Sequence, residues 1–438
     1  MKYTPSFVFV LSAVLPAAAQ SELTLAGAVH EAVARQPSLE AARARTKAAE
    51  ARIPQARSAQ RPHVQYQEML QGGNNPVYVF STLLTERQFT TADFAIDRLV
   101  RPDPVRNFQS TLSAEQTLWD AGATRNGIRA AELGVAMSAE EQRGVAMRTI
   151  ANVARAYHAV TLADEQRKVA EEALQSAEAD GERARTVRAA GMATDADVLA
   201  VDVHIAGLKE RRIRASADAE VARAALNQAM GRPLDTAWAL STPLKPALPG
   251  TSAQERPEVK LAGLAREAAS VKEKEARAGL WPQLFIRGAL EADRRDFVTT
   301  GGGNWVLMGG LRWNLYDGGR SRAAQAEARS LAGSAAAEQR QAQSVVELEL
   351  RQARAALRSA QERIAVNESS ITMAEETLRI VRNRYSSGLS TVTEVLRAQT
   401  ALTETKTRRL AAVYDQRMAA IQVELAAGIL KEDSDVLR

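Results

Sequence analysis

The sequence predicts a mainly helical fold with four strands of the membrane-barrel type, built from two copies of a helix–strand–strand–helix–helix unit. Aromatic residues make up only 5% of the chain, and Ala, Leu and Val carry most of its 45% of apolar residues, which is typical of long packed helices. Residues 120–191 contain no Pro. Short segments elsewhere alternate polar with apolar residues, and several motifs recur at fixed spacing.

The first residues predict export. Lys2 precedes an apolar stretch at residues 7–15, and Pro16 and three alanines follow it. This pattern is typical of a signal peptide spanning residues 1–19 that is cut after Ala19. No later stretch reaches the roughly 18 apolar residues of a membrane-spanning helix.

Composition also excludes several function classes. The chain has no Cys, so disulfides, thiolate metal sites and an acylated N-terminal Cys are excluded. Its net charge of +5 is small against 57 basic and 52 acidic residues, which interleave. A solvated helix surface explains this pattern better than a nucleic-acid partner does.

An internal repeat organises the chain. The segment Leu-Trp-Asp-Ala-Gly at 118–122 recurs 197 positions later as Leu-Tyr-Asp-Gly-Gly, and residues 188–194 match residues 385–391 at the same offset. Upstream the offset is 220, because Pro37 matches Pro257 and Pro62 matches Pro282. The first copy therefore carries 23 extra residues between its two strands.

These marks divide the chain into successive segments. In order they are a first helix at 20–61, a strand pair with a long outward loop at 62–119, a helical hairpin at 120–230, a linker at 231–256, a helix at 257–281, a strand pair at 282–316, a second hairpin at 317–427 and a tail at 428–438.

The hairpins are long and end in similar turns. About seventy helical residues span about 105 Å, far more than a compact globular domain requires. Gly191 suits a left-handed helix end, and Thr194 can cap the next helix with Asp197 at its third position. Gly388 and Thr391 repeat this helix end and cap in the second hairpin. Apolar residues near a seven-residue rhythm after Thr391 favour coiled-coil packing.

The strands alternate with a period of two. Trp305, Leu307 and Leu311 share one face, whereas Asn304 and Arg312 lie on the other. Such alternation over about ten residues is typical of a transmembrane β-strand. Four strands cannot close a barrel, and open edges are not tolerated in lipid. Two chains would supply eight strands, whose side chains would fill the bore, whereas three chains would supply twelve and leave room for an aqueous lumen.

Two alternatives remain open on these observations. The four strands could form a small soluble sheet on a periplasmic coiled-coil scaffold. The insertion at 71–107 is expected to be an outward-facing loop with strand extension, and it could serve in adhesion or phage reception.

The chain resembles the TolC-like outer-membrane efflux proteins over nearly its whole mature length. The resemblance rests on the segment at 23–39, on the strand exits at Asp120, Gly122, Asp317 and Gly319, and on the paired Gly-containing turns. It implies a homotrimer in outer-membrane lipid, with a twelve-stranded β-barrel and an antiparallel coiled-coil helical barrel in the periplasm. Residues 231–256 and the tail would form an equatorial layer.

The resemblance also implies a function and partners. Such a protein is the passive exit duct of a tripartite efflux or type I secretion system, working with a periplasmic adaptor and an inner-membrane pump. The turns at Gly191, Thr194, Gly388 and Thr391 would form the tip where the adaptor docks. No catalytic residue, cofactor or metal site is implied, and the four His residues lack the spacing of metal ligands.

The tip also implies a gate. Tyr385 matches a tyrosine that hydrogen-bonds to an aspartate, here Asp197, and Glu394 matches one carboxylate of a narrow acidic ring. Arg397 replaces a second carboxylate and Ser390 replaces an arginine, so the gating network is altered. Tyr385, Glu394 and Arg397 can equally be exposed cap and helix-face residues.

Overall fold

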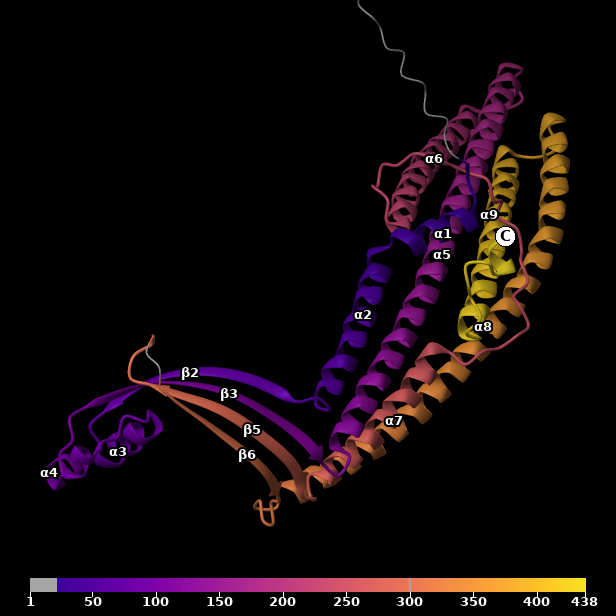
Figure 1. Cartoon of the computed structure of the whole chain (residues 1–438). Coiled ribbons are helices and arrows are strands. Elements are labelled where there is room, and N and C mark those ends of the chain that lie inside the picture. The colour runs from indigo at the N-terminus through magenta and orange to yellow at the C-terminus, as the bar shows by residue number, and fades with distance from the viewer. Residues whose placement is uncertain (1–21, 299–300) are drawn as a thin grey trace, which may run out of the picture. The chain divides into compact units, whose positions relative to one another are not determined.

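The computed structural model describes residues 22–298 and 301–438 (Figure 1). The predicted signal peptide at 1–19 lies outside these ranges. The chain divides into two compact units. One contains the residues up to Glu40, Val145–Gln254 and Leu348–Arg438, and the other contains Ala41–Gly144 and Glu255–Glu347. We call them the hairpin unit and the sheet unit.

The predicted duplication is visible in the element bounds. The first copy comprises α2 (Pro37–Ser58), β2 (His63–Gly73), β3 (Val105–Trp119), α5 (Ala123–Ala189) and α6 (Asp195–Met230). The second comprises α7 (Pro257–Ala278), β5 (Gln283–Arg294), β6 (Gly302–Arg312), α8 (Arg320–Ser386) and α9 (Val392–Ala426). α5 and α8 each have 67 residues, and α2 and α7 each have 22. No helix in the described part of the chain is sufficiently long and apolar to span a membrane.

The expected single helix at 20–61 is two helices. α1 (Leu25–Arg35) is followed by Gln36, which has an extended backbone with φ −64° and ψ 122°. α2 then begins at Pro37. The residue before a proline is pushed out of the helical region by the proline ring, so the break follows directly from the sequence.

The core of the hairpin unit gathers the linker and the chain's C-terminal residues. Tyr157, Leu226 and Trp238 are buried in one cluster with Leu430 and Leu437 of the tail. Part of the linker, β4 (Ala239–Leu240), pairs in parallel with β1 (Glu22–Leu23). The tail ends in a short helix, η2 (Asp435–Leu437).

Side chains of α9 hold the linker. The Gln416 amide donates to the Ala247 carbonyl at 2.6 Å and accepts from the Ala247 N–H at 3.0 Å. Glu424 accepts from the Gly250 N–H at 2.8 Å. Because this part of the linker lies outside β4 and has no regular backbone pairing, these contacts satisfy groups that would otherwise be unpaired.

The four strands of the sheet unit form one antiparallel sheet in the order β2-β3-β5-β6 (Figure 1). The register pairs Tyr66 with Leu112, Leu112 with Leu290, and Leu290 with Trp305. Directly paired residues point to the same face of a sheet. All four strands therefore contribute to one apolar face, as the alternation predicts, and its large side chains are exposed.

The insertion between β2 and β3 is more helical than expected. Its strand extensions reach Gly73 and begin again at Val105. Between them lie α3 (Pro76–Thr85), η1 (Thr91–Phe94) and α4 (Ile96–Val100) instead of an irregular loop. Asn75 caps α3 by accepting from two backbone N–H groups, and Pro76 occupies its first turn, which is a strong helix-start signal.

Candidate functional site at the hairpin ends

Both hairpins end in the same backbone motif. Gly191 and Gly388 have φ values of 74° and 72°. In each turn the N–H of the residue after the glycine reaches back five positions, from Met192 to Val187 at 3.0 Å and from Leu389 to Arg384 at 2.8 Å. A residue other than glycine rarely adopts this left-handed conformation. The prediction for both glycines is confirmed.

The caps of the following helices differ. Thr194 accepts from the Asp197 N–H at 3.3 Å, and the Asp197 carboxylate accepts from the Thr194 N–H at 2.9 Å, so the predicted capping box is present. Thr391 is the N-cap of α9 but makes no side-chain cap hydrogen bond. Its third-position residue, Glu394, instead accepts from the Ser390 hydroxyl.

A buried ion pair joins the two hairpins just behind these turns. The Asp180 side chain on α5 is 6% exposed, and its carboxylate accepts from Arg382 on α8 at 2.7 Å and from Arg183 at 2.5 Å. Arg382 also donates to the Ser176 hydroxyl at 2.5 Å. Burial makes such a pair costly to break, because the remaining charge has no solvent to replace its partner. Sequence reasoning missed it, since a carboxylate on an amphipathic helix usually faces solvent.

Tyr385 lies beside this pair without the expected hydrogen bond. Its ring packs against two apolar clusters, and its buried hydroxyl makes no hydrogen bond within the described residues. Burial, with the nearby Asp197 and Asp180 carboxylates, raises the pKa of the Tyr385 hydroxyl. The expected bond to Asp197 is absent in this structure, where the Asp197 carboxylate accepts from the Thr194 hydroxyl.

Glu394 and Arg397 are both exposed on α9. Glu394 is held by Ser390, one turn earlier in the chain. The two replacements noted in the sequence thus have different surroundings: Ser390 orients Glu394, whereas Arg397 extends from the helix surface. Both remain predicted gate residues.

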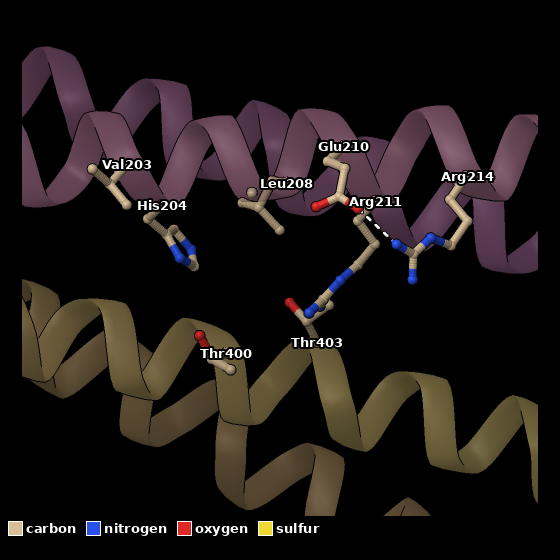
Figure 2. A pocket seen from close by; sticks show the side chains of 9 residues that line it. Val203, His204, Leu208, Glu210, Arg211, Arg214, Thr400 and Thr403 are labelled. Atoms are coloured by element: carbon tan, nitrogen blue, oxygen red, sulfur yellow. Dashed lines mark hydrogen bonds and ion pairs between the residues drawn. The ribbon is translucent and has the colours of Figure 1, made fainter.

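A cavity of 410 Å³ lies between α6 and α9 behind the turns (Figure 2). His204 and Arg211 of α6 point towards Thr400 and Thr403 of α9, while Glu210 pairs with Arg214 at 2.6 Å along α6. Burial, assisted by Arg211, lowers the pKa of His204. The His204 Nε2 atom has no hydrogen-bond partner among the described residues.

The predicted strand exits share one local structure. Asp120 accepts from the Thr124 N–H at 2.7 Å and from the Gly122 N–H at 3.0 Å. Asp317 accepts from the Ser321 N–H at 2.9 Å and from the Gly319 N–H at 3.1 Å. Each aspartate therefore caps a 67-residue helix at the point where the chain leaves the sheet.

Glycine is required at these exits by the backbone. Gly122 and Gly319 have φ values of 86° and 87°, and the residues before them, Ala121 and Gly318, are also left-handed at 55° and 69°. Two successive left-handed residues reverse the chain between strand and helix. This explains why the motif Asp-Ala/Gly-Gly is duplicated.

A second buried polar group lies in the core of the hairpin unit. The Arg417 Nε donates to the His158 Nε2 at 3.1 Å, and Arg417 also donates to the Arg438 carbonyl at 2.8 Å. Burial and the neighbouring Arg417 lower the pKa of His158 to about 3. His158 is therefore neutral at physiological pH and accepts a hydrogen bond from the arginine.

The described residues offer no group of three or more His, Cys, Asp or Glu side chains arranged to hold a metal ion. Charged groups at the hairpin ends instead pair across helices.

Solved structures share this fold. A membrane protein from Pseudomonas aeruginosa has a TM-score of 0.80 at 20% identity, covering 95% of this chain and 93% of that protein. The outer membrane protein VceC from Vibrio cholerae has a TM-score of 0.77 at 19% identity, covering 92% and 96%. The open state of the outer membrane channel MtrE from Neisseria gonorrhoeae has a TM-score of 0.78 at 20% identity, covering 94% and 91%.

Sequence comparisons give the family. The chain is 25% identical over 333 residues to SilC of Salmonella typhimurium, described as a probable outer membrane lipoprotein, which covers 70% of this chain and 69% of that protein. The family described as outer membrane efflux protein matches residues 28–232 and 248–429. These two matched segments each contain one copy of the internal repeat. The chain therefore belongs to the outer membrane efflux protein family, whose fold is that of outer-membrane channels.

Proposed function

We propose that three copies of this chain form the passive exit duct of a tripartite efflux or type I secretion system. The sheet of each copy would supply a third of a twelve-stranded barrel in the outer membrane. The hairpins would form a periplasmic tube, and an adaptor and an inner-membrane pump would supply the cargo and the energy. Small molecules or polypeptides would pass through the water-filled lumen.

The open edges of the sheet carry this proposal. β2 and β6 each have 11 residues and end the strand order β2-β3-β5-β6. One face of the sheet exposes Val64, Leu290 and Trp305 at 66%, 59% and 77%. An exposed apolar face is stable in lipid, but unpaired backbone groups there are not. Pairing β2 of one copy with β6 of the next removes both open edges.

A cysteine cross-link tests the closure, because the natural chain has no Cys. Each variant carries two cysteines. One replaces Gln67 on β2, and the other replaces Asn304, Val306 or Met308 on β6. Within one chain β2 and β6 are separated by β3 and β5, about 14 Å at the usual strand spacing. A disulfide needs Cα atoms within about 7 Å, so it can form only between copies.

We expect oxidation of at least one pair to give covalent trimers on a denaturing gel. Ser113→Cys with Ala289→Cys is the control, because these residues are directly paired within one chain and should cross-link without changing the apparent mass. Only monomers from every β2–β6 pair, with the control oxidised, would refute the shared barrel.

We further propose that the hairpin ends are the gate. Tyr385, Asp197, Glu394, Ser390 and Arg397 would line or brace it, and the turns would receive the adaptor. Support comes from the Asp180–Arg382 pair, which holds α5 to α8 behind the turns.

Conductance in a planar bilayer tests the gate. Asp180→Asn removes the charge that holds Arg382 and should raise single-channel conductance, whereas Tyr385→Phe combined with Asp197→Ala should raise it less. Asp202→Asn is the matched control, since Asp202 pairs with Arg185 at 2.8 Å on the exposed surface. Equal conductance in all variants would place the gate elsewhere.

The alternative of a periplasmic scaffold with a small soluble sheet is disfavoured by the family match. A scaffold would also leave the apolar face of the sheet uncovered.

A further inference from the structure

A cavity of 740 Å³ opens where the sheet meets the helices of the sheet unit. The end of β3, the first turns of α5 and the last turn of α7 line it. Its apolar wall includes Leu118 and Trp119, together with Trp281, which lies just before β5. Arg125, Lys274 and Arg277 supply its charge. Lys274 and Arg125 extend from different helices into the same cavity, so the positive charge is not confined to one element.

A β-bulge turns Trp119 to the apolar face of the sheet. The β3–β5 register shifts between Thr117 and Trp119, so Trp119 rather than Leu118 pairs with Leu284. Leu284 belongs to the apolar face, and paired residues share a face. Trp119 is 44% exposed and Trp281 is 58% exposed. Exposed tryptophans at the end of a membrane strand mark the lipid–water interface.

The cations of this cavity are weakly compensated. Within the described residues, Arg125 and Lys274 make no ion pair, and Arg277 approaches Glu273 only at 3.8 Å. The carboxylate in the lining, Asp120, is already committed to capping α5. The cavity therefore combines positive charge with an apolar wall.

We propose that this cavity binds the headgroup of an anionic phospholipid from the periplasm-facing leaflet of the outer membrane. The inference rests on the proposed barrel, because only a membrane-embedded sheet brings phosphates to this level. Arg125, Lys274 and Arg277 contact the phosphate, while Leu118 and Trp119 contact the first acyl carbons. Basic pockets beside membrane segments recognise anionic headgroups in this way. This contact fixes the height of the sheet in the bilayer.

The corresponding positions of the other repeat reproduce this charge only in part, since Arg125 is matched by Arg322. Lys274 is matched by Pro54, and Arg277 by Arg57, which pairs with Glu132 at 3.5 Å. One such site per chain is expected.

Native mass spectrometry of the detergent-purified, full-length mature protein tests the site, with phosphatidylglycerol and phosphatidylcholine as probes. The wild-type protein should retain phosphatidylglycerol in preference to phosphatidylcholine. Arg125→Ala, Lys274→Ala and Arg277→Ala should each weaken phosphatidylglycerol binding about five-fold, and the triple variant should lose the preference. Phosphatidylcholine binding should not change.

The control is the triple variant Arg322→Ala, Arg329→Ala, Arg340→Ala, which removes equal charge from α8 and includes the repeat equivalent of Arg125. It should keep the preference. Equal loss in the control would show a nonspecific charge effect and overturn the proposal. The proposal would also be overturned if the cavity triple variant kept its preference for phosphatidylglycerol, or if inorganic phosphate displaced the lipid completely.

Conductance separates this inference from the proposed function. A wild-type protein that forms no channel in a planar bilayer refutes the duct. A wild-type channel whose triple variant conducts normally and keeps its lipid preference refutes the lipid site alone.

Discussion

The two hairpin ends have the same backbone and different chemistry. Each helix ends at a left-handed glycine, Gly191 or Gly388, and a threonine begins the next helix. In the first hairpin, however, Thr194 and Asp197 form a closed capping box, whereas in the second Thr391 does not act in this way and Ser390 holds Glu394. Duplication preserved the turn and allowed the side chains around it to diverge.

The divergence makes the two hairpins complementary. Arg382 corresponds to Arg185 at the repeat offset, but Arg382 pairs with the buried Asp180 while Arg185 pairs with the exposed Asp202. The position that corresponds to Asp180 in the second hairpin is Thr377, so the buried acid occurs on one hairpin only. A duplicated chain can therefore form a joint with two distinct sides.

Removing the buried ion pair, Asp180–Arg382, should lower stability more than any of the other substitutions. Asp180→Ala leaves Arg382 without its main partner, and removing one member of a buried pair costs about 3 kcal/mol. We expect hydrogen exchange at the ends of α5 and α8 to accelerate accordingly. Arg185→Ala, at the exposed equivalent, should cost less than about 1 kcal/mol. Equal effects would show that burial does not distinguish the two pairs.

The core of the hairpin unit offers a contrasting case, since its buried His158 is kept neutral. Its pKa is lowered to about 3, so the unfolded chain takes up a proton first as pH falls below the ordinary value near 6.5. Stability contributed by neutral His158 is therefore complete above pH 6.5 and is lost as pH falls towards 3. The loss is about 1.4 kcal/mol per pH unit at most.

Thermal unfolding between pH 7 and pH 4.5 measures this loss. His158→Gln keeps an acceptor for Arg417 and removes the titration, so its midpoint should depend less on pH than that of the wild type. The exposed His63 provides the control, because His63→Gln should leave the pH dependence unchanged. A wild-type slope retained by His158→Gln would assign the effect to other groups.

The strand exits should respond equally in the two repeats. Gly122→Ala and Gly319→Ala each place a side chain on a left-handed backbone, which costs about 1 kcal/mol. Gly127 lies within α5, where an added methyl group would meet open space, so Gly127→Ala should instead stabilise the helix by about 0.5 to 1 kcal/mol. Opposite signs in apparent melting temperature are the expected result, and a loss with Gly127→Ala would contradict this account.

The smallest difference in stability is expected between substitutions at the two helix caps, Thr194 and Thr391. Thr194→Ala breaks a capping box and should cost about 1 kcal/mol. Thr391→Ala removes no cap hydrogen bond and should cost a few tenths of that amount. Hydrogen exchange in the first turns of α6 and α9 compares them directly. A greater loss at Thr391 would mean that its hydroxyl acts in the assembled protein.

Much of the fold could be read from local sequence. Left-handed turns need glycine, capped helix starts need Thr, Asp or Asn, and membrane-facing strands alternate, so Gly191, Asp317 and the strand from 304 were recognisable. The break at Gln36 was also recognisable, because a proline disfavours the helical conformation of the residue before it and Pro37 follows Gln36. The helices of the insertion were missed, although Asn75-Pro76 is a helix-start signal.

The candidate site was less predictable. The resemblance identified Tyr385 and Asp197 as hydrogen-bond partners. In the structure the Asp197 carboxylate instead accepts from the Thr194 N–H, and the Tyr385 hydroxyl makes no hydrogen bond among the described residues. Asp180 and Arg382 carry no local signal, because they lie 202 positions apart. Their pairing depends on which helix faces are turned together.

By itself the sequence determined the duplication, the bounds of the strands and of the hairpin helices to within a few residues, and the apolar face of the strands, because backbone preference and side-chain period are local properties. Only the tertiary structure decided which charges are buried and paired. Asp180 and Asp197 are both helix carboxylates. Asp180 is 5% exposed and bound to an arginine of the other hairpin, whereas Asp197 is half-buried and belongs to the capping box of its own helix. That difference arises from packing between distant segments, where burial sets the strength of a charge interaction.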